Sequence, residues 1–157
     1  MKLSKFVKAS KIVITVVYFA LLSYIVFFAK RRREYNVRTL KLIPFQNNIQ
    51  AFRNMDVNNK KDVYGFFINI LGNIVLFVPL SIIFVVVFNF RSNRNVIVWA
   101  FLVSLTIEVM QFYFKAGVSD IDDILLNVLG AVIGVIILKI GKKHLRYLQQ
   151  NGYQPHV

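Results

Sequence analysis

The chain has 157 residues, of which 57% are hydrophobic and 17% are charged, and it carries 20 lysine and arginine residues against 7 acidic ones. A soluble domain of this length cannot bury so much apolar surface, so a soluble globular protein is excluded. The absence of cysteine excludes disulfides, thiolate metal sites and thiol catalysis. Because the basic residues flank long apolar runs, they favour anionic lipid head groups as partners and not nucleic acid.

Four apolar runs are long enough to cross a bilayer, which takes about 20 helical residues. They cover residues 12–29, 66–90, 95–114 and 121–140. The first follows a basic start but has no small-residue cleavage site, so we expect a retained helix and not a signal peptide. The sequence therefore predicts an all-α, polytopic membrane bundle of about four transmembrane helices. We expect a single domain over residues 1–157.

The connection between the first two runs is long, and irregular structure can lie within it. Its segment LKLIPFQNNIQAF alternates apolar and polar residues around Pro44. Proline disfavours helix at the preceding Ile43, but a helix can begin just after it. An interfacial or re-entrant segment and a plain connecting loop both fit this pattern. At the other end of the sequence, we expect the basic, polar tail from Gly141 to lie on the membrane surface.

The orientation of the bundle does not follow from charge. Four crossings put both termini and the short second connection on one side, and the long first connection on the other. The two sides carry equal numbers of lysine and arginine residues. The positive-inside rule therefore leaves the orientation open.

Polar residues inside the apolar runs lie toward one side of the bilayer. Because successive helices alternate in direction, the start of the second, the end of the third and the start of the fourth share one face. Helical spacing places each set on one stripe: Asn69 and Asn73; Ser104, Glu108 and Gln111; and Asp120, Asp123 and Asn127. Unpaired polar groups are costly in hydrocarbon, so the stripes should face one another. The sequence predicts a shared polar pocket on the side of the first connection.

Glu108 carries the largest cost, since a charge near the centre of a membrane helix costs about 2.5 to 3.5 kcal/mol. It needs a cation or a proton, and we expect Arg38 to supply the cation, with Lys41 and Arg53 as alternatives. The asparagines can instead be interhelical contacts, and the aspartates can be helix-start acids that favour the helix dipole. For Asp122, which is off the stripe, we expect only the helix-start role.

Three other features concern the packing of the helices. Gly130 and Gly134 form a small-xxx-small pair, which predicts a close helix–helix seam. Pro79 removes a backbone hydrogen bond and predicts a kink in the second helix. Ser119 is expected to cap the fourth helix.

Three segments resemble, in order and spacing, the signature blocks of VanZ-like membrane proteins. They are RTLKLIPF at residues 38–45, NILGNIVLFVPLS at 69–81 and SLTIEVMQFYFKAGVSDIDDILLNVLGAVIG at 104–134. The resemblance covers most of residues 38–138, and its most specific part is E-x-x-Q followed by D-x-x-D-x-x-x-N. Residue by residue, it implicates Arg38, Pro44, Phe45, Asn73, Pro79, Glu108, Gln111, Asp120, Asp123, Asn127 and Gly130. This chain has Lys41 where the family block usually has asparagine.

The resemblance implies a cell-envelope protein with an outward-facing pocket and cytoplasmic termini, in a family whose founding members confer low-level teicoplanin resistance. Three functions compete. The first is binding of an anionic or amphiphilic ligand, such as a lipid, a cell-wall intermediate or a lipoglycopeptide. The second is an intramembrane enzyme acting on a lipid-linked substrate, with Glu108 as base and Asp120 and Asp123 as acid partner or metal ligands. The third is a small proton-linked transporter that uses Glu108.

We favour the first function, because it needs only the residues present and because no histidine or cysteine joins the polar stripes. It requires no cofactor and no metal. Its expected partners are membrane lipids, together with the ligand of the pocket.

Overall fold

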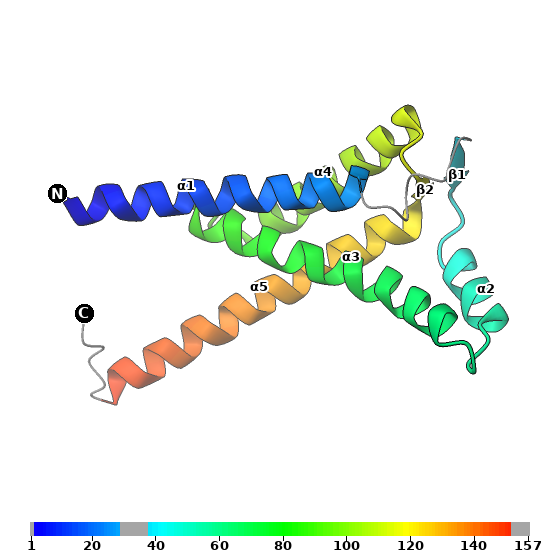
Figure 1. The fold of residues 1–157 in the computed structure, drawn as a ribbon. Coiled ribbons are helices and arrows are strands. Elements are labelled where there is room, and N and C mark those ends of the chain that lie inside the picture. Colours follow the sequence, from blue (N-terminus) through cyan, green and yellow to red (C-terminus); the bar gives the residue numbers. More distant parts are fainter. Residues whose placement is uncertain (1, 29–37, 152–157) are drawn as a thin grey trace.

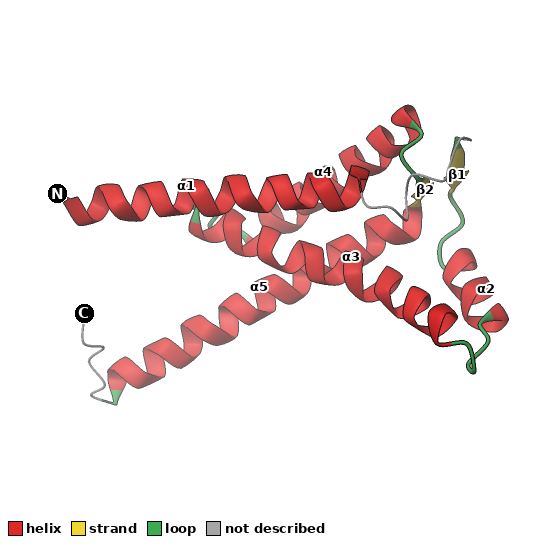
Figure 2. Ribbon diagram, in the orientation of Figure 1, coloured by secondary structure: helices red, strands yellow, loops and turns green. Residues whose placement is uncertain are grey.

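The computed structural model describes residues 2–28 and 38–151 of the chain. Its elements, in chain order, are α1 (Lys2–Ser23), the π-helix η1 (Tyr24–Phe28), β1 (Thr39–Lys41), α2 (Gln46–Asn54), α3 (Lys60–Val86), α4 (Asn93–Phe114), β2 (Val118–Asp120) and α5 (Ile121–Gln150). Four of the helices, α1, α3, α4 and α5, are long and apolar enough to cross a membrane. The predicted all-α, polytopic architecture is confirmed (Figure 2). The end of the first predicted span, at residue 29, lies outside the described residues.

The four long helices alternate in direction, which gives the bundle two distinct ends (Figure 1). At one end, which we call the loop end, lie α2, β1 and β2. At the other, which we call the terminal end, lie the start of α1, the end of α5 and the turn that joins α3 to α4. An even number of crossings produces this arrangement, so the two ends face opposite sides of the membrane.

The helix α3 begins earlier and ends earlier than the apolar run predicts. It begins at Lys60 because the side chain of Asn59 caps it, accepting a hydrogen bond of 3.1 Å from the backbone N–H of Lys61. It ends at Val86 because Asn89 adopts a left-handed conformation with φ 57°. The chain then folds back, and residues 87–90 belong to a turn and not to the span.

The last helix, α5, is longer than predicted. It continues past Gly141 to Gln150 without interruption, so the expected surface tail is helix. At 1.5 Å per residue, its 30 residues extend about 45 Å, more than the roughly 30 Å hydrocarbon thickness of a bilayer. Its basic last turns therefore project beyond the apolar layer at the terminal end.

The core of the bundle is the crossing of α3 and α5, where two glycines allow close contact. A Cβ atom at Gly130 would lie 2.9 Å from the carbonyl carbon of Ile74, and one at Gly134 would lie 2.7 Å from the carbonyl oxygen of Val78. Both distances are too short for a real side chain. The predicted glycine seam is confirmed, and it holds the first half of α5 against α3.

Candidate functional site

The first connection is tied to the start of α5 by a two-stranded parallel sheet. Its pairs are Thr39 with Val118, Leu40 with Ser119, and Lys41 with Asp120. We did not predict these strands, because three-residue segments carry too little alternation to be read from sequence. The sheet brings the motif segment before α2 to the loop end of α4 and α5.

Glu108 supports the corner where β2 meets α5. It is 3% exposed, and its Oε2 accepts a hydrogen bond of 2.9 Å from the backbone N–H of Asp120. Asp120 in turn caps α5, since its Oδ1 accepts a hydrogen bond of 3.0 Å from the backbone N–H of Asp122. The prediction that Ser119 caps α5 is therefore wrong, because Asp120 occupies the capping position. The buried carboxylate of Glu108 fixes the backbone that presents the aspartates.

Two aspartates at the start of α5 hold α2 in place. Asp122 accepts hydrogen bonds of 2.6 Å from the backbone N–H of Phe45 and 2.9 Å from Nδ2 of Asn48. Asp120 Oδ2 accepts one of 3.0 Å from Nδ2 of Asn47. We call these contacts the α2 latch. Asp122 is only 2% exposed. The prediction that it serves only as a helix-start acid is therefore wrong.

Phe45 has an unusual backbone conformation at this latch. Its φ of 63° lies in the left-handed region, and it precedes α2 without a side-chain cap. Such a conformation costs about 1 to 3 kcal/mol for a residue other than glycine. Its hydrogen bond to the buried carboxylate of Asp122 offsets that cost, because charge-assisted hydrogen bonds are the strong ones.

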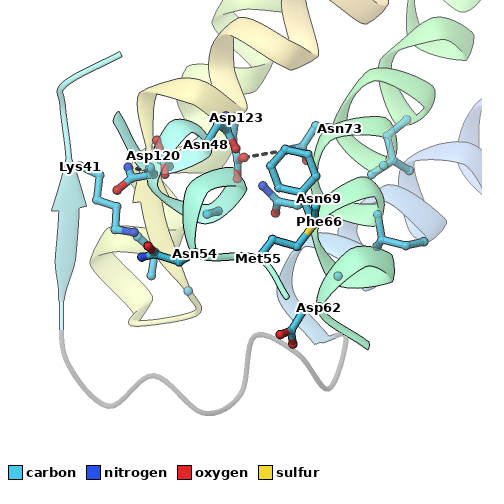
Figure 3. Close-up of a pocket in the computed structure, with 18 of the residues that line it drawn as sticks. Lys41, Asn48, Asn54, Met55, Asp62, Phe66, Asn69, Asn73, Asp120 and Asp123 are labelled. Atoms are coloured by element: carbon cyan, nitrogen blue, oxygen red, sulfur yellow. Dashed lines mark hydrogen bonds between the residues drawn. The ribbon is translucent and has the colours of Figure 1, made fainter. Parts of the chain in front are cut away.

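Asp123 points to a different partner, on α3. Its Oδ1 accepts a hydrogen bond from Nδ2 of Asn73, and both residues are buried (Figure 3). The two stripes on α3 and α5 thus meet, as alternating helix directions predict. The three hydrogen bonds of the latch hold α2, whereas Asn73 and Asp123 lie in the wall of a cavity.

The cavity has a volume of about 580 Å³ and lies between α2, α3, the two strands and the start of α5 (Figure 3). Its polar lining residues are Lys41, Asn47, Asn48, Asn54, Asp62, Asn69, Asn73, Asp120 and Asp123. Apolar side chains, among them Phe66 and Leu76, complete the wall. We call it the loop-end cavity. Its size is typical of small-molecule sites, which measure roughly 300 to 1,000 Å³.

Of the residues expected at the pocket, Asn69, Asn73, Asp120 and Asp123 line this cavity. Glu108, Gln111 and Asn127 lie deeper. Gln111 Nε2 donates to the carbonyl oxygen of Val26 in η1 at 3.2 Å, and Asn127 Nδ2 donates to Ser104 Oγ at 2.8 Å. These two amides join α4 to η1 and to α5, so they hold the helices that carry the cavity.

The remaining expected residues belong to the first connection. Pro44 and Phe45 form the turn before α2, as the proline pattern predicts. The guanidinium carbon of Arg38 lies 5.8 Å from the ring centroid of Tyr113, a cation–π geometry. An ion pair between Arg38 and Glu108 is not among the contacts of the described residues.

Several residues of the site were not predicted from the sequence. Asn47, Asn48 and Asp122 belong to the latch, and Asp62 and Asn54 line the cavity. The three amide residues after the Pro-Phe turn, Gln46, Asn47 and Asn48, were a usable signal, because they break an otherwise alternating segment. The partner of each asparagine could not be read from the sequence.

Comparison with known proteins gives a consistent result. A family model described as VanZ/LLP1 matches residues 14–142. Protein VanZ of Enterococcus faecium is 28% identical over 113 residues, which cover 71% of this chain and 59% of that relative. The chain thus spans about three fifths of the relative's length. No solved structure matches it. Given the extent of the family match and the four membrane helices, this chain belongs to the VanZ/LLP1 family and is a multi-pass membrane protein.

Proposed function

We propose that this protein is a cell-envelope membrane protein that binds an amphiphilic ligand in the loop-end cavity, with that cavity at the outer face of the membrane and both termini in the cytoplasm. The observation that carries the proposal is the mixed wall of the cavity. Amides and carboxylates of α2, α3 and α5 line one part, and apolar side chains of α3 and η1 line another. Such a wall suits a molecule with a hydrogen-bonding head and an apolar tail.

The charges of the wall select among ligands. Among the described lining residues, the cation Lys41 faces three carboxylates, those of Asp62, Asp120 and Asp123. A ligand that is only anionic would be repelled by this set. Hydroxyl, amide and ammonium donors are favoured instead, and Lys41 can contact one phosphate or carboxylate. We therefore favour the amphiphilic over the purely anionic ligand.

The helix α2 supports access from the membrane side. Asn47 and Asn48 on one side of α2 bind the aspartates of α5, while Ile49 and Phe52 are exposed. The ring of Phe52 lies 5.8 Å from that of Phe66, which lines the cavity. A helix with one polar and one apolar face lies at the lipid–water boundary. The tail of an amphiphile can follow this apolar face while its head enters the cavity.

Two classes of molecule have the required chemistry: lipid-linked cell-wall intermediates and acylated glycopeptides such as teicoplanin. Both combine sugar or peptide donors with an alkyl chain. Sequestering either one at the outer face would contribute to glycopeptide resistance. The enzyme and transporter alternatives gain no support from Glu108, whose carboxylate is buried and accepts a backbone hydrogen bond.

The experiment is a calorimetric titration of the full chain in nanodiscs of zwitterionic lipid. The probes are teicoplanin, a glycopeptide without an acyl chain, and a lipid-linked cell-wall precursor. We expect saturable binding of a probe that carries a hydrocarbon chain. Asp123→Asn should weaken its affinity about tenfold or more, because the hydrogen bond from the ligand to the charged carboxylate is lost. Asp56→Asn is the matched control, since Asp56 is exposed and outside the cavity. Absence of binding by both teicoplanin and the lipid-linked precursor would contradict the proposal.

A further inference from the structure

A second cavity, of about 470 Å³, is lined by residues of the terminal end of the bundle and shares no lining residue with the loop-end cavity. It is formed by the end of α3, the turn from α3 to α4, the first residue of α4 and the part of α5 near Lys139. We call it the terminal-end cavity. The proposed function makes no use of it.

Three cations meet in this cavity without a carboxylate. Arg91 comes from the turn, and Lys139 and Lys142 come from successive turns on one face of α5. None of the described residues that line the cavity is acidic. The sequence also contains no aspartate or glutamate between Asp62 and Glu108, or anywhere after Asp123. Three like charges around one cavity repel one another, and an anion bound among them removes the repulsion.

Neutral groups of the cavity add hydrogen-bond donors. The side-chain amides of Asn89 and Asn93 line it. Asn93 is the first residue of α4, and the preceding Ser92 makes no side-chain capping bond. The first N–H groups of a helix have no partner within the helix, so the start of α4 adds donors and a partial positive charge to the three cations.

The other wall of the cavity is apolar and lies within an aromatic group. Phe90 and Leu138 line the cavity. The ring of Phe90 stacks on Phe84 with centroids 5.2 Å apart, and it lies 6.4 Å from the ring of Trp99. Of these rings, that of Trp99 is of the type that gathers at the level of lipid head groups. A phosphate held by the cations is therefore adjacent to the surface along which acyl chains run.

We propose that the terminal-end cavity binds the phosphate group of an anionic membrane phospholipid. Arg91, Lys139 and Lys142 surround the phosphate, and Phe90 and Leu138 contact the first part of the acyl chains. Basic pockets between membrane helices recognise anionic head groups in this way. A soluble phosphate has the same charged group but lacks the chains, so the two sources can be separated by experiment.

The test uses Trp99, the single tryptophan of the chain, as its reporter. The full-length protein is reconstituted in vesicles of phosphatidylcholine with increasing amounts of brominated phosphatidylglycerol, and quenching of tryptophan fluorescence is compared with that caused by brominated phosphatidylcholine. We expect the anionic lipid to quench at lower mole fraction. Lys139→Gln and Lys142→Gln should each lower that preference by about fivefold, and Lys142→Arg should retain it.

Lys143→Gln is the matched control, because it removes the same charge from the same helix but does not line the cavity. We expect it to leave the preference unchanged. Three results would overturn the proposal: equal quenching by the two brominated lipids, a loss with Lys143→Gln as large as with Lys139→Gln, or reversal of the quenching by inorganic phosphate or glycerol 3-phosphate in the aqueous phase. The last result would identify a site for soluble phosphates.

Discussion

Asp122 and Asp123 are adjacent at the start of α5, but they hold different parts of the protein. Asp122 accepts hydrogen bonds from the first connection, at Phe45 and Asn48, whereas Asp123 accepts one from Asn73 on α3. Successive helical residues differ by about 100° in direction, which separates the two carboxylates. One aspartate therefore positions α2, and the other belongs to the wall of the loop-end cavity.

Asp122→Asn should loosen α2. The amide removes the charge that Phe45 and Asn48 contact, and hydrogen bonds to charged groups contribute about 1.5 to 3 kcal/mol. We expect hydrogen exchange at the amides of residues 46–54 to become roughly ten times faster or more. Exchange in α3 should remain unchanged. Wild-type exchange in α2 of this variant would mean that the latch does not hold the helix.

Asp123→Asn should have the opposite profile. It leaves the latch intact, so exchange in α2 should match the wild type, while binding of an acylated probe weakens. The pair of variants is informative because both remove one charge from the first turn of α5. If both variants changed exchange and binding alike, the two aspartates would share one role.

Glu108→Ala should destabilise the protein, because the backbone N–H of Asp120 loses its acceptor in a buried position. An unsatisfied buried group costs about 1 to 3 kcal/mol, which thermal unfolding in detergent can measure. Glu108→Gln should recover most of this loss, since its carbonyl oxygen can accept the same bond. A loss as large with glutamine would indicate that the charge of Glu108 is required.

A double-mutant cycle separates Arg38 from Glu108. Arg38 lies over Tyr113, and Glu108 bonds to the backbone of Asp120, so we expect the losses from Arg38→Gln and Glu108→Gln to add within about 0.5 kcal/mol. The readout is again thermal unfolding. A coupling energy well above that range would indicate that Arg38 and Glu108 form the ion pair expected from the sequence.

Gly130→Ala should prevent close packing of α3 and α5. A Cβ at this position meets the backbone of Ile74, which cannot move aside as a flexible side chain can. We expect a fall in thermal stability and loss of the monodisperse peak on size-exclusion chromatography in detergent. Gly141→Ala is the control in the same helix, because nothing lies within 4 Å of a Cβ there. It should be neutral or stabilising by up to about 1 kcal/mol.

Cysteine labelling tests the orientation, and the absence of native cysteine makes each engineered site unambiguous. Asn58 at the loop end and Gln150 at the terminal end are both exposed. An impermeant maleimide should label Asn58→Cys in intact cells, and Gln150→Cys only after permeabilisation. Labelling of Gln150→Cys alone in intact cells would reverse the proposed topology.

The helices and their facing stripes could be predicted because both depend on local periodicity. The pairs Asn73–Asp123 and Ser104–Asn127 follow once helices alternate in direction. The latch and the sheet could not be predicted, since they join short segments more than 70 residues apart whose patterns do not specify a partner. The residue pattern identified Glu108 and Arg38 as notable, but not which atoms each contacts.

The pairing of β1 with β2 also has a consequence for biosynthesis. β1 leaves the ribosome long before β2, and the two helices α3 and α4 are made in between. Until β2 and the start of α5 have been translated, neither β1 nor the strained turn at Phe45 has its hydrogen-bond acceptors or donors. The loop-end cavity therefore cannot be complete before the start of α5 has been translated, although β1 and α2 are made much earlier.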